Sequence, residues 1–263
     1  TLATEHDAFA AETAAVSKLL DTDTTAGAET ESVLARFREV LVPAEEHEIS
    51  AILRRRLFES IDESAAAEAA EAFADYYADL EKKEINLNFW PDVKHRISLS
   101  YPFHPELIRV LDSRVGTIPS FQRTRGALRL LAEAVADLWS KRTDAVIINV
   151  ADLPLDADAV ANALTRAIDR ETFAQVIEAD VAGPGSHAAD VDKARFTGTT
   201  PYTTRAATTV FVHSLEQTPS RGATSVDVLR GTVAPGHEPD FVEEALAQLG
   251  LSAWHLDYDG VRW

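Results

Sequence analysis

The sequence predicts a mostly α-helical fold with a minor β component, and three observations lead to this prediction. Hydrophobic residues make up 46% of the 263 positions, while there are only 11 Gly and 11 Pro, a composition typical of a folded, helix-rich protein. Residues 64–83 are rich in alanine, the strongest helix former. Elsewhere apolar residues recur at helical spacing over long stretches, and β-like runs are short. We divide the chain into four segments: residues 1–48, 49–140, 141–200 and 201–263.

The first segment, residues 1–48, is predicted to mix helix, loop and strand. A helix is expected over residues 8–20, and the small polar residues 21–32 are typical of a loop. A short strand is expected before Pro43.

The second segment, residues 49–140, is predicted to be a small bundle of four helices joined by irregular connections. The first helix has an apolar face with i, i+3, i+4, i+8 spacing, formed by Ile49, Ile52, Leu53 and Leu57. The other helices are expected over residues 64–83, 105–115 and 121–139. Pro105 suits an early helix position, so we interpret His104 as a capping or packing residue rather than a metal ligand or catalytic group.

The third segment, residues 141–200, is predicted to be a small α/β connection. A short buried strand or extended segment is expected over residues 145–150 and a strand over 176–183, with an amphipathic helix over 155–173 between them. Residues 183–204 are predicted to form a loop. Within that loop, His187–Asp192 offers one His and two Asp, for which we favour a solvated loop over a metal site.

The fourth segment, residues 201–263, has the element order of a winged helix. Helices are expected over residues 205–215, 224–231 and 238–250, and two strands around the turn signal Asp259-Gly260. The third helix would be the DNA reader, but it carries four acids and no base, so phosphates would repel it. We therefore favour a protein-contact or structural role over direct DNA binding.

The composition excludes several classes of function. A formal charge of −18 argues against broad binding of nucleic acid or anionic membrane, and the absence of Cys excludes disulfides and thiol chemistry. No apolar run approaches the roughly 20 residues that a membrane span needs, so we expect a cytoplasmic protein without membrane contact.

Three arginines crowd the start of the helix predicted over residues 121–139. Leu128, Leu131, Val135 and Leu138 form its apolar side on a helical wheel, with Arg125 and Arg129 at the shoulder and Arg123 nearly opposite. A shoulder arginine is commonly solvated or salt-bridged, with its stem covering apolar surface. The alternative is that Arg125 offers a guanidinium fork to phosphate oxygens across a domain boundary. For Arg54–Arg56, by contrast, we expect that at least one arginine forms a structural salt bridge.

The order of these elements resembles part of an AAA+ ATPase. "TLAT" (residues 1–4) is similar to the end of the sensor-1 strand. "ARFREVLVPAEEHEISAILRRRLF" (residues 35–58) resembles an arginine-finger segment, the last core strand and the first lid helix. In "TRGALRLL" (residues 124–131), Arg125 lies three, five and six residues before a leucine. This matches the spacing around the sensor-2 arginine of a lid helix.

More closely, residues 101–132, "YPFHPELIRVLDSRVGTIPSFQRTRGALRLLA", with "RRRLFESID" upstream, resemble the AAA+-like ATPases called domain of unknown function 499. This family includes the large ATPases of BREX-type phage-defence systems. The resemblance implies that residues 1–48 end an AAA+ core, that 49–140 form its helical lid, and that 201–263 form a winged-helix-like domain.

The resemblance also implies site residues and ligands. Arg125, with Arg123 as second choice, would contact the γ-phosphate of ATP from the lid, and Arg36 or Arg38 would be the arginine finger offered to a neighbouring subunit. ATP and Mg²⁺ are the implied cofactors, and other protein subunits are the implied partners. No Walker A motif of the form G-x-x-x-x-G-K-[ST] and no apolar strand ending in Asp-Glu is present. We therefore expect the C-terminal part of an ATPase, which by itself is not catalytic.

Two competing hypotheses remain at the level of sequence. A non-enzymatic adaptor could be built from the helical bundle and an acidic winged helix, with the arginines as ordinary surface charge. A nucleic-acid-binding regulator would need a basic surface that the sequence does not show.

Overall fold

The computed structural model describes residues 46–116, 118, 124–143, 145–167, 172–215 and 222–263. Contacts between Cα atoms group residues 44–263 into one compact unit. The helix, loop and strand predicted within residues 1–45 lie outside the described residues. No described helix combines the length and the apolarity needed to cross a membrane.

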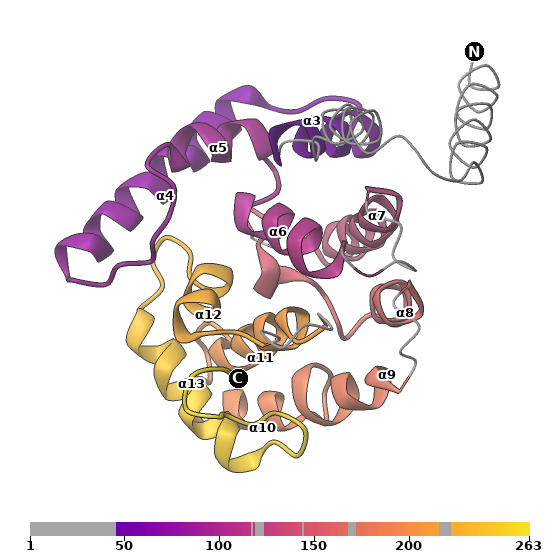
Figure 1. Cartoon of the computed structure of the whole chain (residues 1–263), viewed down its shortest axis with the longest axis vertical. Helices are drawn as coiled ribbons and strands as arrows, with labels where there is room; N and C mark the ends of the chain where they lie inside the picture. Colours follow the sequence, from indigo (N-terminus) through magenta and orange to yellow (C-terminus); the bar gives the residue numbers. More distant parts are fainter. Residues whose placement is uncertain (1–45, 117, 119–123, 144, 168–171, 216–221) are drawn as a thin grey trace, which may run out of the picture. The chain divides into compact units, whose positions relative to one another are not determined.

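The described part of the unit is mostly helical, as predicted (Figure 1). Between the α-helices lie two short π-helical segments and one 3₁₀ turn. The elements in order are α3 (Glu46–Leu57), α4 (Glu63–Lys82), α5 (Val93–Ser100), α6 (Pro105–Val110), η1 (Leu111–Val115), α7 (Thr124–Lys141), η3 (Val150–Asp152), α8 (Asp158–Ala167), α9 (Phe173–Val176), η4 (Ile177–Val181), α10 (His187–Arg195), α11 (Tyr202–His213), α12 (Ser225–Thr232) and α13 (Pro239–Ser252).

The helices predicted for residues 49–140 are present, with one addition. Helix α4 begins at the N-cap Asp62, whose side chain accepts hydrogen bonds from the backbone N–H groups of Ser64 and Ala65. Its alanine-rich face lets α5 pack closely against it. Helix α5 (Val93–Ser100) lies in a stretch that we expected to be an irregular connection. The prediction failed there because the segment lacks a clear apolar stripe and its helix is stabilised by packing against α3 and α4.

His104 caps helix α6, which confirms its interpretation as a capping and packing residue. Its Nδ1 accepts a hydrogen bond from the backbone N–H of Glu106 (3.1 Å), and its Nε2 lies 2.9 Å from the hydroxyl of Tyr77. Phe73 and Phe89 place their rings within 6 Å of the imidazole. Burial lowers the pKa of His104 from 6.5 to about 3, so the ring is neutral and Nε2 carries the proton donated to Tyr77.

The strand predicted over residues 176–183 is wrong, and residues 145–150, expected as a strand or an extended segment, form no strand. Residues 145–150 contribute one isolated parallel bridge, between Phe103 and Ile148, in which Ile148 donates to the carbonyl of Pro102 and accepts from the N–H of His104. Residues 176–181 are helical and belong to α9 and η4. Short apolar runs do not distinguish a buried strand from a buried helical turn, which explains the error over residues 176–183.

Helix α10 also corrects a prediction, because residues 183–204 were expected to form a loop. Ser186 is its N-cap and accepts a hydrogen bond from the backbone N–H of Ala189 (3.2 Å). The helix has little amphipathic periodicity, which hides it in the sequence. It packs against α11, α13 and η4.

Helix α11 is the centre of the second half of the unit. Every residue from Ala206 to His213 is buried, because α10, α12, α13, η3 and η4 pack around this helix. The Cβ of an alanine at position 231 in α12 would come within 2.6 Å of the Thr209 side chain, so glycine permits the close approach of α12 to α11. A helix surrounded in this way needs partners for its polar groups inside the protein.

Two acids from other elements supply partners for α11. The buried carboxylate of Asp192, on α10, accepts hydrogen bonds from the backbone N–H groups of Thr203 (2.8 Å) and Thr204 (2.9 Å) and from the Thr204 hydroxyl (2.7 Å). Asp152, in η3, forms an ion pair with Arg205, which also donates to the carbonyl of Thr232 (2.9 Å). Asp192 therefore acts as the N-terminal cap of α11 from a different helix.

The two halves of the unit share one hydrophobic core that runs from Ile49 to Leu256. Polar contacts reinforce it: Arg230 donates to the carbonyls of Leu87 and Asn88, and Tyr76 donates to the carbonyl of His237 (2.8 Å). This core continues across residues 140 and 200, where we placed domain boundaries. Those boundaries stay predictions.

The three helices predicted for residues 205–250 are present as α11, α12 and α13, but the terminal hairpin is not. Residues 253–263 contain no strand. Instead, Trp263 exchanges two backbone hydrogen bonds with Ala223 (2.9 and 3.2 Å), and Asp259 donates its backbone N–H to Arg262 (3.0 Å) across the Asp259-Gly260 turn. The turn signal was correct, whereas the strands that should flank it did not form.

We predict that removing the cap of α11 destabilises the unit. Asp192→Ala leaves the N–H groups of Thr203 and Thr204 without an acceptor in a buried setting, so the free energy of unfolding should fall by about 1–3 kcal/mol. Urea denaturation followed by circular dichroism measures this change. Asp190→Ala on the exposed side of the same helix is the control, and equal effects of the two variants would contradict the prediction.

We also predict that His104 makes the protein sensitive to acid. The native state holds this imidazole neutral down to about pH 3, whereas the unfolded chain takes up a proton below about pH 6.5. Stability should therefore fall as pH drops from 6.5 towards 3, with a contribution from His104 of up to about 1.4 kcal/mol per pH unit.

The test compares His104→Asn, which keeps a capping oxygen, with His95→Asn at an exposed position. Unfolding free energies between pH 7 and 4, measured with urea, should show a shallower slope only in His104→Asn. If His104→Asn had the same slope of unfolding free energy against pH as the unsubstituted protein, His104 would be ruled out as the source of the acid sensitivity.

Candidate functional site

Helix α7 presents one buried face and one exposed face, and its arginines lie on the exposed one. The buried side chains are Ala127, Leu130, Leu131 and Ala134, so the buried face is rotated towards Leu130 relative to the stripe predicted from the sequence. Leu128, Val135 and Leu138 are only partly buried against the core. Arg125 and Arg129, which are one turn apart, are both exposed.

The first turn of α7 is free of acids, and the N-terminus of a helix carries a partial positive charge. Residues 113–132 include four arginines and no acid, in a chain with a formal charge of −18. The described residues offer Arg125 no ion pair and no hydrogen bond. Its guanidinium is thus available to a ligand of opposite charge.

The other arginines predicted for the site, Arg36, Arg38 and Arg123, lie outside the described residues.

Arg54, which was not predicted for the site, is structural. It pairs with Glu63 (2.8 Å) and donates to the carbonyl of Leu99 (3.0 Å). This contact confirms the expectation of a salt-bridge partner among Arg54–Arg56.

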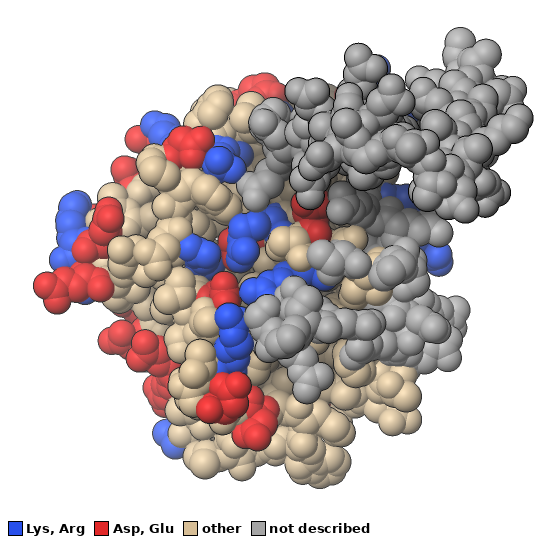
Figure 2. All heavy atoms as spheres, in the orientation of Figure 1, with Lys and Arg blue, Asp and Glu red and all other residues tan. Residues whose placement is uncertain are grey.

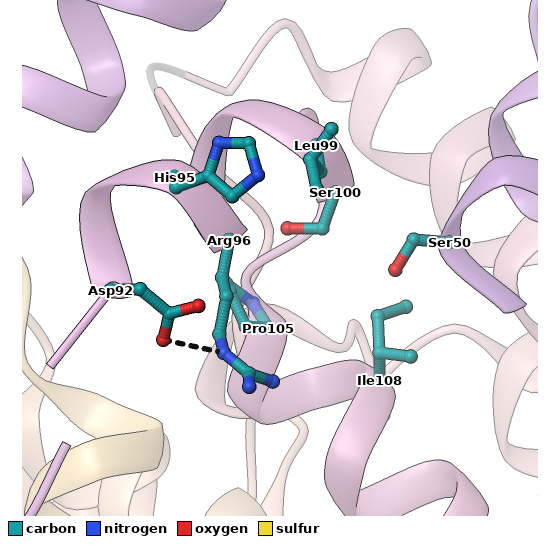
Figure 3. Close-up of a pocket in the computed structure, with 8 residues that line it drawn as sticks. All are labelled: Ser50, Asp92, His95, Arg96, Leu99, Ser100, Pro105 and Ile108. Carbon is teal, nitrogen blue, oxygen red and sulfur yellow. Dashed lines mark hydrogen bonds and ion pairs between the residues drawn. The ribbon is translucent and has the colours of Figure 1, made fainter. Parts of the chain in front are cut away.

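A pocket of about 210 Å³ opens between α3, α5 and α6 (Figure 3). Its polar groups already bond within the protein: Arg96 donates to Asp92 (2.9 Å), and Ser100 donates to the carbonyl of Phe103 (2.7 Å). Ser50 lies across the space from Arg96 and Asp92 (Figure 3). The guanidinium of Arg96 also lies 5.0 Å from the centroid of the Trp90 ring. We find no arrangement of groups here that indicates a reaction.

Asp180 forms a cluster that the sequence did not predict. Its fully buried carboxylate accepts hydrogen bonds from Nδ1 of His187 (2.7 Å), Nδ1 of His255 (2.8 Å) and the backbone N–H groups of Trp254 and His255. Burial raises the pKa of Asp180, but these hydrogen bonds outweigh it and hold the pKa below its usual value. No local signal could reveal a contact between residues about 75 positions apart.

The Asp180 cluster anchors the C-terminal segment beside a hollow of about 510 Å³, lined by residues that include Phe211, His255, Arg262 and Trp263. Three or more His, Asp or Glu side chains arranged to hold a metal ion are not found among the described residues. The loop predicted for His187–Asp192 is wrong, since these residues begin α10.

Comparison with known proteins identifies the chain by family alone. Searches of curated proteins and of solved structures found no match. Residues 44–244 match the family model of the DUF499 second domain, which agrees with the sequence motif of residues 101–132. Because this match covers most of the chain, the protein belongs to the DUF499 family.

Proposed function

We propose that this chain is the lid and C-terminal part of an AAA+-like ATP-binding protein that couples ATP binding or hydrolysis to conformational change. Membership of the DUF499 family supports the proposal, because the motif of residues 101–132 resembles ATPases of that family. The observation that carries it is the position of Arg125. This exposed arginine lies in the acid-free first turn of α7, where the sensor-2 arginine of an AAA+ lid is expected.

In this proposal, Arg125 binds the terminal phosphate of ATP from the lid. A fixed guanidinium near a phosphoryl group stabilises the negative charge that develops during transfer, and it needs little reorganisation because α7 is packed on its opposite face. Bound Mg²⁺ would neutralise phosphate charge, but its ligands and the Walker A loop would come from outside this chain. The finger role proposed for Arg36 or Arg38 would require a neighbouring subunit.

The biological setting follows from the same resemblance. We place this machine in the phage defence of bacteria or archaea, in the cytoplasm, with other protein subunits as partners. Direct DNA binding by α13 has no support, because its exposed side chains include Asp240, Glu243 and Glu244 and the helix carries no base.

We predict that Arg125→Ala lowers ATP turnover in the full-length ATPase. Losing one preorganised cation should reduce kcat by about 10²-fold, and losing a charge-assisted contact should weaken ATP binding by about tenfold or more. Phosphate release and binding of a fluorescent ATP analogue provide the two readouts. Circular dichroism should remain unchanged, because Arg125 is exposed and forms no ion pair with a described residue.

Arg55→Ala is the matched control, since Arg55 is also exposed and its loss changes the net charge equally. It should leave turnover unchanged. Unaltered turnover and ATP affinity in Arg125→Ala would favour the alternative, a non-enzymatic adaptor that docks protein partners. A Walker A motif in the sequence upstream of Thr1 would argue against that adaptor.

A further inference from the structure

Two exposed helix faces in this unit share the same spacing and carry opposite charges. On α7 the exposed positions Arg129, Ala132 and Ala136 are separated by three and four residues, and Trp139 follows three residues later. On α13 the exposed positions Glu244, Ala247 and Leu251 have the same separations. Trp139 is 82% exposed and Leu251 is 84% exposed, so each face ends in a large apolar side chain that this copy leaves in water.

The chemistry along the two faces is complementary. Each face begins with a charged side chain, positive at Arg129 and negative at Glu244. Alanine follows, and a large apolar side chain ends the face. Alternating separations of three and four residues allow two helices to pack side by side with their side chains interdigitated. In a parallel arrangement, Arg129 would meet Glu244, and Ala132 would meet Ala247. Leu251 would then lie over Ala136, next to Trp139.

These faces do not cover each other within one copy. Helix α7 packs against α3 and α8, whereas α13 packs against α10, α11 and α12, and both faces are exposed. Figure 1 shows α7 and α13 on different sides of the unit, and Figure 2 shows acidic side chains along the lower left, where α13 is drawn. Within the described residues, neither face covers the other, and a second molecule can supply the partner for each.

We propose that α7 of one copy docks in parallel along α13 of a second copy of this chain, with Arg129 pairing with Glu244 and Trp139 packing beside Leu251. The second copy is the favoured occupant because the chain itself carries both complementary faces. The contact joins two different surfaces, so it generates a ring or a linear assembly unless two such contacts close a dimer. It does not use Arg125 and stands independently of the proposed ATP site.

Two features indicate that the association is weak. A single helix pair buries less than a standard protein interface of about 1,600 Å², and copies with a charge of −18 repel each other at long range. Glu244 also lies 4.0 Å from Arg195 in its own copy, but both side chains are well exposed and such a pair contributes little. We therefore expect association that is detectable at high protein concentration in salt near 0.15 M, where the long-range repulsion is screened.

The test uses charge reversal in the purified chain, with sedimentation velocity as the readout. Arg129→Glu and Glu244→Arg should each weaken self-association by about tenfold or more, because each places like charges opposite each other. An equimolar mixture of the two variants should associate again, since every contact between unlike copies then joins opposite charges. Trp139→Ser should weaken association without changing any charge.

Arg55→Glu and Glu68→Arg are the controls, because they change the net charge of exposed helix positions outside the two faces by the same amounts. If only general repulsion mattered, Glu244→Arg and Glu68→Arg would both associate more strongly, because each lowers the net negative charge. A loss of association in Glu244→Arg therefore isolates the specific contact. Unsubstituted protein that stays monomeric would overturn the proposal. So would single variants that behave like their controls, or a mixture that fails to recover association. Circular dichroism of each variant verifies that the fold is retained.

Discussion

Helix α11 is buried on every side, and the second half of the unit is arranged around this constraint. A buried helix cannot leave the N–H groups of its first turn to water, so another element must supply acceptors. Asp192 reaches them from α10, which ties the position of α10 to the start of α11. The ion pair between Arg205 and Asp152 ties η3 to the same helix. Glycine at position 231 then lets α12 lie close against it.

The same central helix explains why the unit has one core. Segment 149–152 lies between α6 and α11, and the bridge between Phe103 and Ile148 joins the first group of helices to the second. Buried His104 sits at that junction, held by Glu106 and Tyr77, and its neutral state follows from its burial.

The exposed surface, in contrast, separates its charges. Exposed acids lie along α13, whereas Arg125 and Arg129 are exposed on the first turns of α7, where the first turn contains no acid. In the proposals above, Arg125 and Arg129 have different tasks although they share a helix face: the first contacts phosphate and the second contacts another copy. Charge segregation of this kind favours specific contacts in a chain whose overall charge opposes association.

The sequence by itself determined the helical class, the helices with clear apolar periodicity or alanine enrichment, the capping role of His104 and the DUF499 motif. These features depend on neighbours in the chain, which a sequence displays directly. The tertiary structure alone decided that residues 176–181 are helical, that residues 187–195 form α10 and that the terminal segment forms no hairpin. It also decided that Asp180 bonds His187 and His255 and that α7 exposes Arg125 and Arg129. Those outcomes depend on which distant groups bury and satisfy one another, because short apolar runs and isolated charges have no preferred partner until the core is assembled.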